Sequence, residues 1–151
     1  MAQLRVARSA VVDAPASLIF DIIASPARHA EFDGSGTVQE AAEGPERLGP
    51  DARFGMDMRM GVGYRMGNRV VEFEEGRLIA WRHVGAHRWR WELEPLGDAA
   101  TRVTETFDYS TVPAPMAFAY QMLGIPSRNA RSIEASLLRL KDLAEKEHTD
   151  G

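Results

Sequence analysis

Residues 127–147, which read SRNARSIEASLLRLKDLAEKE, have the pattern of one long amphipathic helix. The apolar side chains recur at steps of four, three and four, which places them on one face of an α-helix: Ile133, Leu137, Leu140 and Ala144. Ser127 follows Pro126 and occupies the position expected of an N-cap. Because one side of this helix is apolar, another element must cover it, and the middle of the chain supplies that element.

Five segments between residues 53 and 109 carry alternating apolar and polar side chains, as half-buried β-strands do. They are Arg53–Met60, Tyr64–Glu74, Leu78–Val84, His87–Glu94 and Thr101–Tyr109. Short turn-like segments separate them, which predicts an antiparallel meander. Each strand has one apolar and one charged face, so we expect one side of the sheet to face water and the C-terminal helix to cover the other.

The N-terminal third predicts one strand followed by two short helices. Gln3–Val12 alternates as a strand, Pro15 is expected at the first position of a helix, and Ser25-Pro26 opens a second short helix that ends near Glu31. Residues 37–42 are a candidate short strand. Residues 112–124 bridge the last strand to the C-terminal helix, and the glycine and proline at the end of this bridge predict a break.

Composition limits the classes of function. A chain of 151 residues is expected to form a single domain, residues 1–151, with a substantial core. A net charge of −4 without long charge runs argues against a nucleic-acid partner, and the absence of cysteine excludes disulfides. We see no signal peptide and no integral membrane segment, so we expect a cytoplasmic protein. Monomer and homodimer both stay open.

Several stretches resemble the START-like (SRPBCC) superfamily, which includes polyketide cyclase/dehydrase and lipid-transport proteins. They are Val12–Pro15 with Phe20–Pro26, Glu72–Trp81, Trp91–Pro95 and Thr101–Phe107. The resemblance covers nearly the whole chain. It implies an α+β helix-grip fold, in which a curved antiparallel sheet wraps around a long C-terminal helix and two short helices follow the first strand. It also implies a deep apolar pocket between sheet and helix, which relatives use for transport, binding, cyclisation or chaperone work.

Methionine and aromatic side chains on the predicted inner face are the candidates for the pocket wall. They are Met56, Met58, Met60, Tyr64, Trp81, Trp89, Trp91, Phe107 and Tyr109, with Phe118 and Met122 from the bridging segment. Methionine gives an adaptable surface for an apolar ligand, and tryptophan can stack on an aromatic one. The same residues equally suit ordinary core packing, or fixing the sheet to the helix.

Glu105 is the most informative single residue, because its alternation places it on the dry face with Val103 and Phe107. A carboxylate there costs several kcal/mol unless it is paired or protonated. One interpretation is a polar anchor, or a general acid/base with a raised pKa. The other is an ion pair with Arg128 or Arg131, or a position near the pocket mouth.

The four histidines do not form a metal site in our interpretation. His83 and His87 flank one turn but lack a convincing third ligand, so we expect no metal and no cofactor. His83 is the better candidate for a hydrogen-bonding role at the pocket edge. His29 and His148 are expected on the surface.

We therefore expect a protein that binds a small hydrophobic ligand, such as a lipid, a polyketide or an isoprenoid-like molecule. The alternative is an enzyme of the polyketide cyclase, aromatase or dehydratase type, for which Glu105, Tyr64 and His83 are the only candidate catalytic residues. A third hypothesis is an interaction module, which a contiguous exposed apolar patch would support.

Overall fold

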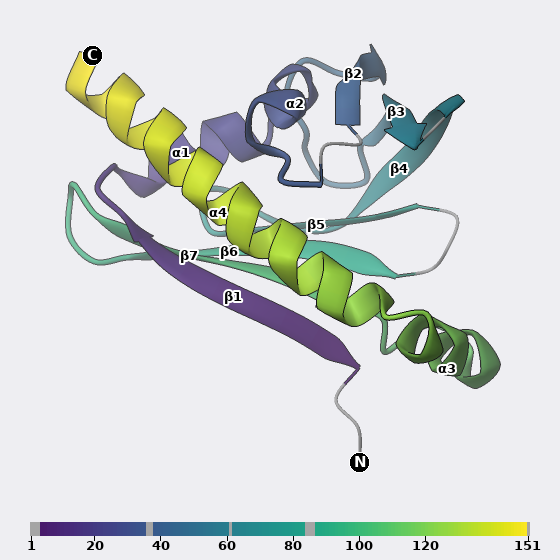
Figure 1. Ribbon diagram of the computed structural model, residues 1–151. Helices are drawn as coiled ribbons and strands as arrows, with labels where there is room; N and C mark the ends of the chain where they lie inside the picture. Colours follow the sequence, from purple (N-terminus) through teal and green to yellow (C-terminus); the bar gives the residue numbers. More distant parts are fainter. Residues whose placement is uncertain (1–3, 36–37, 61, 84–86, 151) are drawn as a thin grey trace.

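The computed structural model describes residues 4–35, 38–60, 62–83 and 87–150 (Figure 1). Its elements in chain order are β1 (Arg5–Val12), α1 (Ala16–Ile23), the 3-10 helix η1 (Pro26–Arg28), α2 (His29–Phe32), β2 (Val38–Glu43), β3 (Arg53–Met60), β4 (Val62–Glu74), β5 (Leu78–His83), β6 (Arg88–Pro95), β7 (Thr101–Asp108), α3 (Ala114–Met122) and α4 (Ile125–Asp150). The predicted α+β architecture is confirmed, with short helices after the first strand and a long C-terminal helix after the sheet.

The sheet has seven antiparallel strands in the order β1-β7-β6-β5-β4-β3-β2. The predicted five-stranded meander is confirmed as β3 to β7, and β1 and β2 extend it at its two edges. The pairing of β4 with β5 shifts register between Val70 and Glu72, and that of β2 with β3 shifts twice. Such irregularities increase local twist and bend a strand, which favours a curved sheet.

Helix α4 lies across one face of this sheet and extends beyond it toward the C-terminus (Figure 1). Ile133, Leu137, Leu140 and Ala144 are each at most 3% exposed, so the predicted buried stripe is confirmed. Leu138, one position from this stripe, is 62% exposed. The helix contacts β1 and β7 of the sheet and the short helices α1 and α2. The sheet and α4 are therefore the two layers that enclose the core.

Two predicted helix starts were wrong in detail. Helix α4 begins at Ile125, so Ser127 lies inside its first turn and is not the N-cap. Proline is tolerated at Pro126 because a backbone N–H in the first turn has no intrahelical acceptor. The break falls at Gly124, whose φ of 69° is the left-handed conformation that glycine adopts without a steric penalty. Helix α1 begins at Ala16, one residue after the predicted proline.

The outer face of the sheet is charged, as the alternation predicts. Arg88 and Arg90 of β6 both lie within ion-pair distance of the Glu72 carboxylate on β4. The exceptions are Thr106 and Asp108 of β7, which alternate with the dry-face residues Glu105 and Phe107 but are only 8% and 7% exposed. Arginine side chains cover a sheet surface with their apolar stems. Over the described residues, none of the helices has the length and apolar composition needed to cross a membrane.

Candidate functional site

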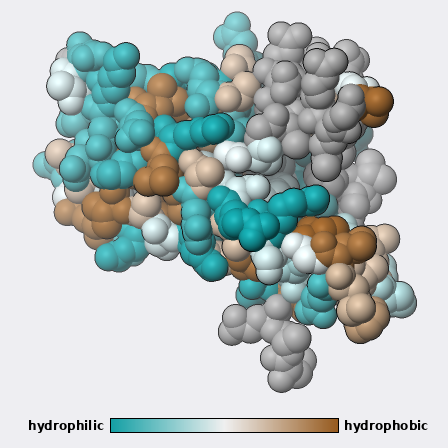
Figure 2. Space-filling model, in the orientation of Figure 1, coloured by the Kyte–Doolittle hydropathy of each residue, from teal (hydrophilic) through white to brown (hydrophobic). Residues whose placement is uncertain are grey.

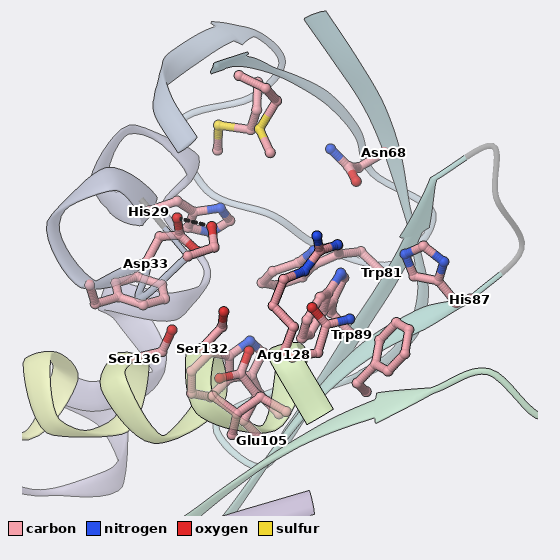
Figure 3. A pocket seen from close by; sticks show the side chains of 18 of the residues that line it. His29, Asp33, Asn68, Trp81, His87, Trp89, Glu105, Arg128, Ser132 and Ser136 are labelled. Atoms are coloured by element: carbon pink, nitrogen blue, oxygen red, sulfur yellow. Dashed lines mark hydrogen bonds between the residues drawn. The ribbon is translucent and has the colours of Figure 1, made fainter. Parts of the chain in front are cut away.

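A cavity of about 480 Å³ lies between the inner face of the sheet and the N-terminal half of α4 (Figure 3). Strands β3 to β7 form one wall, α4 forms the opposite wall, and α2 with the loop after it borders a third side. Tyr120 of α3 also reaches the cavity. The volume falls within the range of about 300–1,000 Å³ that is usual for small-molecule sites. This cavity is the candidate functional site.

Indole and phenyl rings from three adjacent strands form the aromatic wall of the cavity. Trp81 on β5 is directly opposite Trp89 on β6, and Trp91 on β6 is opposite Glu105 on β7. The ring centroids of Trp89 and Phe107 are 5.0 Å apart. Large rings with few rotatable bonds lose little entropy when they contact a ligand. This wall therefore offers a stiff aromatic surface on which a ligand can pack.

Strands β3 and β4 supply a softer part of the wall. Met56 is buried and Met58 is half-buried, and both line the cavity beside Phe54. Asn68 of β4 adds a single amide there. Flexible thioethers adapt to ligands of different shape. The combination suits an apolar ligand whose outline is not flat throughout.

Helix α4 presents a polar stripe to the cavity, opposite the aromatic wall (Figure 3). Arg128, Ser132 and Ser136 follow at intervals of four residues, so they share one face of the helix. Ser136 Oγ accepts a hydrogen bond of 2.7 Å from the backbone N–H of Gly34. Arg128 is exposed, lines the cavity and has no ion-pair partner among the described residues.

Glu105 lines the cavity from β7 and is only 6% exposed. No arginine in the described part of the chain lies within ion-pair distance of it, so the predicted pairing with Arg128 or Arg131 is wrong. Among the described residues, neither its Oε1 nor Nε1 of Trp91 across the strand pair has a hydrogen-bond partner. Burial, assisted by the Asp33 carboxylate, raises the pKa of Glu105 well above its ordinary value. The protonated, hydrogen-bond-donating carboxylic acid is therefore favoured.

His29 was expected on the surface, but it is buried and lines the cavity. Its imidazole stacks on Trp81, with centroids 5.0 Å apart and an interplanar angle of 18°. Because a carbonyl oxygen only accepts, the 2.8 Å contact with Ile23 O identifies Nε2 as the protonated nitrogen. Burial lowers the pKa of His29 to about 4, so the ring is neutral and Nδ1 keeps an acceptor lone pair. Sequence alternation could not find this residue, because it begins a helix of only one turn.

A second histidine closes the other end of the aromatic wall. His87 Nδ1 lies 3.1 Å from the Tyr120 hydroxyl, and the His87 ring packs against Phe107 with centroids 4.9 Å apart. This contact ties α3 to the start of β6. The side chain of His83, our candidate for the pocket edge, lies outside the described residues. No group of three or more potential metal ligands occurs in the described part of the chain.

The structure brings together seven of the predicted ligand-binding residues. Those that line the cavity are Met56, Met58, Trp81, Trp89, Trp91, Glu105 and Phe107. Tyr109 is buried, stacks on the Phe107 ring and does not line the cavity. Phe118 and Met122 are 63% and 71% exposed on α3 and do not line it either. The side chains of Met60 and Tyr64 lie outside the described residues.

Sequence reasoning missed the polar side of the cavity. The signal that could have found it is the four-residue spacing of Arg128, Ser132 and Ser136, which lies beside the apolar stripe of the same helix. Phe32 and Phe54 also line the cavity. Phe32 was missed because it ends a helix of one turn, whereas Phe54 shares the alternation of Met56 and Met58 on β3 and was not included among the candidates.

Comparison with solved structures shows the same fold. Protein NE0264 from Nitrosomonas europaea superimposes with a TM-score of 0.72 at 15% identity, over 99% of both chains. A START superfamily protein from Mycobacterium smegmatis gives a TM-score of 0.69 at 16% identity, over 95% of this chain and 98% of the other. The Zhui aromatase/cyclase from Streptomyces sp. R1128 gives 0.64 at 17% identity, over 90% and 92%.

Comparison of sequences gives a closer relationship. The uncharacterized protein Rv0088 of Mycobacterium tuberculosis (strain ATCC 25618 / H37Rv) is 44% identical over 142 residues, which cover 91% of this chain and 63% of that protein. The chain thus spans less than two thirds of the curated relative's length. The model of the family described as polyketide cyclase/dehydrase and lipid transport matches residues 3–145. The fold and its START-like neighbours agree with this match. The chain therefore belongs to the polyketide cyclase/dehydrase and lipid transport family.

Proposed function

We propose that the chain binds a small, mostly apolar ligand between the sheet and α4, with a polar group of the ligand near Glu105. The observation that carries this proposal is a cavity of about 480 Å³ with an aromatic wall, in which Glu105 Oε1 and Trp91 Nε1 have no hydrogen-bond partner among the described residues. Lipid, polyketide and isoprenoid-like molecules are the ligand classes that suit such a wall. A cavity of this size is costly if it serves packing alone, because deleted contacts destabilise a core.

The test fills the cavity with a side chain. Ser132→Phe places a ring on the cavity face of α4, whereas Ser127→Phe makes the same change at an exposed position of the same helix. Titration of the neutral probe N-phenyl-1-naphthylamine by calorimetry should show binding to the native protein and to Ser127→Phe, and loss of binding in Ser132→Phe. Equal affinity for all three proteins would contradict the proposal. Native mass spectrometry of protein purified from its host would then identify the natural ligand.

Glu105 favours a second candidate function, an enzyme of the polyketide cyclase, aromatase or dehydratase type. A protonated carboxylic acid inside an apolar cavity can act as a general acid toward a carbonyl of a bound chain. The Zhui aromatase/cyclase shares the fold and makes this class of reaction worth testing. If Glu105→Gln turns over an identified substrate at the native rate, this candidate is wrong.

A further inference from the structure

Two buried groups of opposite hydrogen-bonding character face the same cavity. The Nε2–H of His29 is committed to the carbonyl of Ile23, so Nδ1 is an acceptor without a hydrogen-bond partner among the described residues. Glu105 is the converse case, because a protonated carboxyl in an apolar site has an O–H to donate. Figure 3 shows the two side chains approaching the cavity from different elements, α2 and β7.

The surroundings of these two groups disfavour an anion at this end of the cavity. The Asp33 carboxylate acts electrostatically on both His29 and Glu105, and it also accepts a 2.6 Å hydrogen bond from the Ser35 hydroxyl. A second carboxylate placed there would be desolvated and repelled. Arg128 also lines the cavity, from α4, but it is exposed whereas Asp33 is half-buried, so solvent screens its charge more strongly. The polar end of a matching ligand is therefore neutral.

The same end of the cavity is lined by flat rings. Trp81 carries the His29 imidazole stacked on one face, and Phe54 meets both of these rings edge-on with centroids 5.6 and 5.7 Å away. This packing fixes the plane of the imidazole and hence the direction of its lone pair. A ligand whose hydroxyl meets that lone pair must place it in a defined direction, which a rigid ring achieves at less entropic cost than a flexible chain.

We propose that the cavity recognises a neutral aromatic hydroxy-carbonyl compound, whose hydroxyl donates to Nδ1 of His29 and whose carbonyl accepts from the carboxylic acid of Glu105. This inference rests on the proposed function and names its ligand class. A site that hydrogen-bonds a hydroxyl discriminates against analogues without one, because the buried acceptor is then left unpaired. His29 and Glu105 would thus determine specificity while the aromatic wall provides affinity.

The experiment compares naphthalenes that differ only in one substituent, titrated by calorimetry at pH 7. We expect 2-naphthol to bind roughly tenfold more tightly than 2-methoxynaphthalene, and 2-acetylnaphthalene roughly tenfold more tightly than naphthalene, as one buried hydrogen bond provides. The anion 2-naphthoate should bind more weakly than either. Equal affinity of all neutral probes would overturn this inference and leave the proposed function intact. Binding by none of them would overturn both.

Variants assign each preference to its residue. His29→Phe keeps an aromatic ring but removes Nδ1, so the preference for naphthol should disappear and that for acetylnaphthalene should stay. Glu105→Leu should do the reverse. Glu105→Gln keeps an N–H donor and should retain the acetylnaphthalene preference. Phe118→Ala, at an exposed position outside the cavity, is the control that should change neither preference. Loss of both preferences in Phe118→Ala, or of neither in the two cavity variants, would contradict the assignment.

Discussion

Two buried ionisable side chains, His29 and Glu105, have pKa shifts that favour their neutral forms. His29 and Glu105 are 5% and 6% exposed, and burial is the largest cause of the pKa shift of each. The shifts have opposite signs because burial disfavours the charged form, which is the cation of histidine and the anion of glutamate. The folded protein consequently binds fewer protons than the unfolded chain at His29 and more at Glu105. Each residue makes stability depend on pH in its own window.

For His29 we expect acid sensitivity. The folded pKa of about 4 lies below the unfolded value of 6.5, so between these values the unfolded chain binds a proton that the folded protein does not. The free energy of unfolding should fall by about 3 kcal/mol as the pH drops from 6.5 to 4, on the basis of 1.36 kcal/mol per unit. Urea denaturation followed by circular dichroism at several pH values measures this. His29→Phe should flatten the curve in that window, and an unchanged slope would contradict the assignment.

For Glu105 we expect the opposite sign. Its folded pKa is raised, so its favourable contribution is complete below the unfolded pKa and is lost as the pH rises toward the folded pKa. Glu105→Gln cannot ionise, so its free energy of unfolding relative to the native protein should increase with pH above about 4.3. Because Asp33 also acts on Glu105, Asp33→Asn provides a second measurement and should reduce the effect. A difference that is constant from pH 4 to 8 would be incompatible with a buried, protonated Glu105.

Helix α4 both packs on the sheet and lines the cavity. Its C-terminal part packs the apolar stripe on the sheet, while Arg128, Ser132 and Ser136 face the cavity. Neighbouring leucines allow the packing contribution to be isolated. Leu140 is fully buried and Leu138 is 62% exposed. We expect Leu140→Ala to lower the free energy of unfolding by about 2–5 kcal/mol, and Leu138→Ala by less than about 0.5 kcal/mol. Chemical denaturation of both variants measures the free energy of unfolding. Equal losses would contradict the burial of Leu140 and the exposure of Leu138 on α4.

The loop after α2 approaches α4 so closely that only glycine fits at position 34. A Cβ there would clash with the backbone O of Ser132 and would lie 2.5 Å from the backbone N of Ser136. We expect Gly34→Ala to destabilise the fold by about 1–3 kcal/mol, because neither backbone can retreat easily. Gly49→Ala is the matched control, since a Cβ at that loop position meets nothing within 4 Å. Thermal unfolding of both variants should show a lower Tm for Gly34→Ala alone.

At the scale of the molecule, periodic patterns predicted the architecture and irregular segments did not predict the site. The alternation in β3 to β7 and the stripe on α4 fixed which faces are buried, because burial imposes one period on each element. His29 escaped because a single turn of helix has no period to read. Phe118 and Met122 were wrongly predicted to line the pocket, because apolar character alone does not show which side of α3 packs on the protein. Figure 2 shows the hydrophobic atoms that gather at the α3 end of the molecule.

The placement of Trp81, Trp89 and Trp91 has a practical consequence, because these are the only tryptophans in the chain and all three line the cavity. The tryptophan emission of the protein therefore originates wholly at the site. Any occupant that changes polarity near the indoles, or quenches them, will alter the spectrum while the backbone stays folded. Emission can serve as a label-free reporter of occupancy, and for the same reason an emission change alone is not a measure of denaturation in this protein.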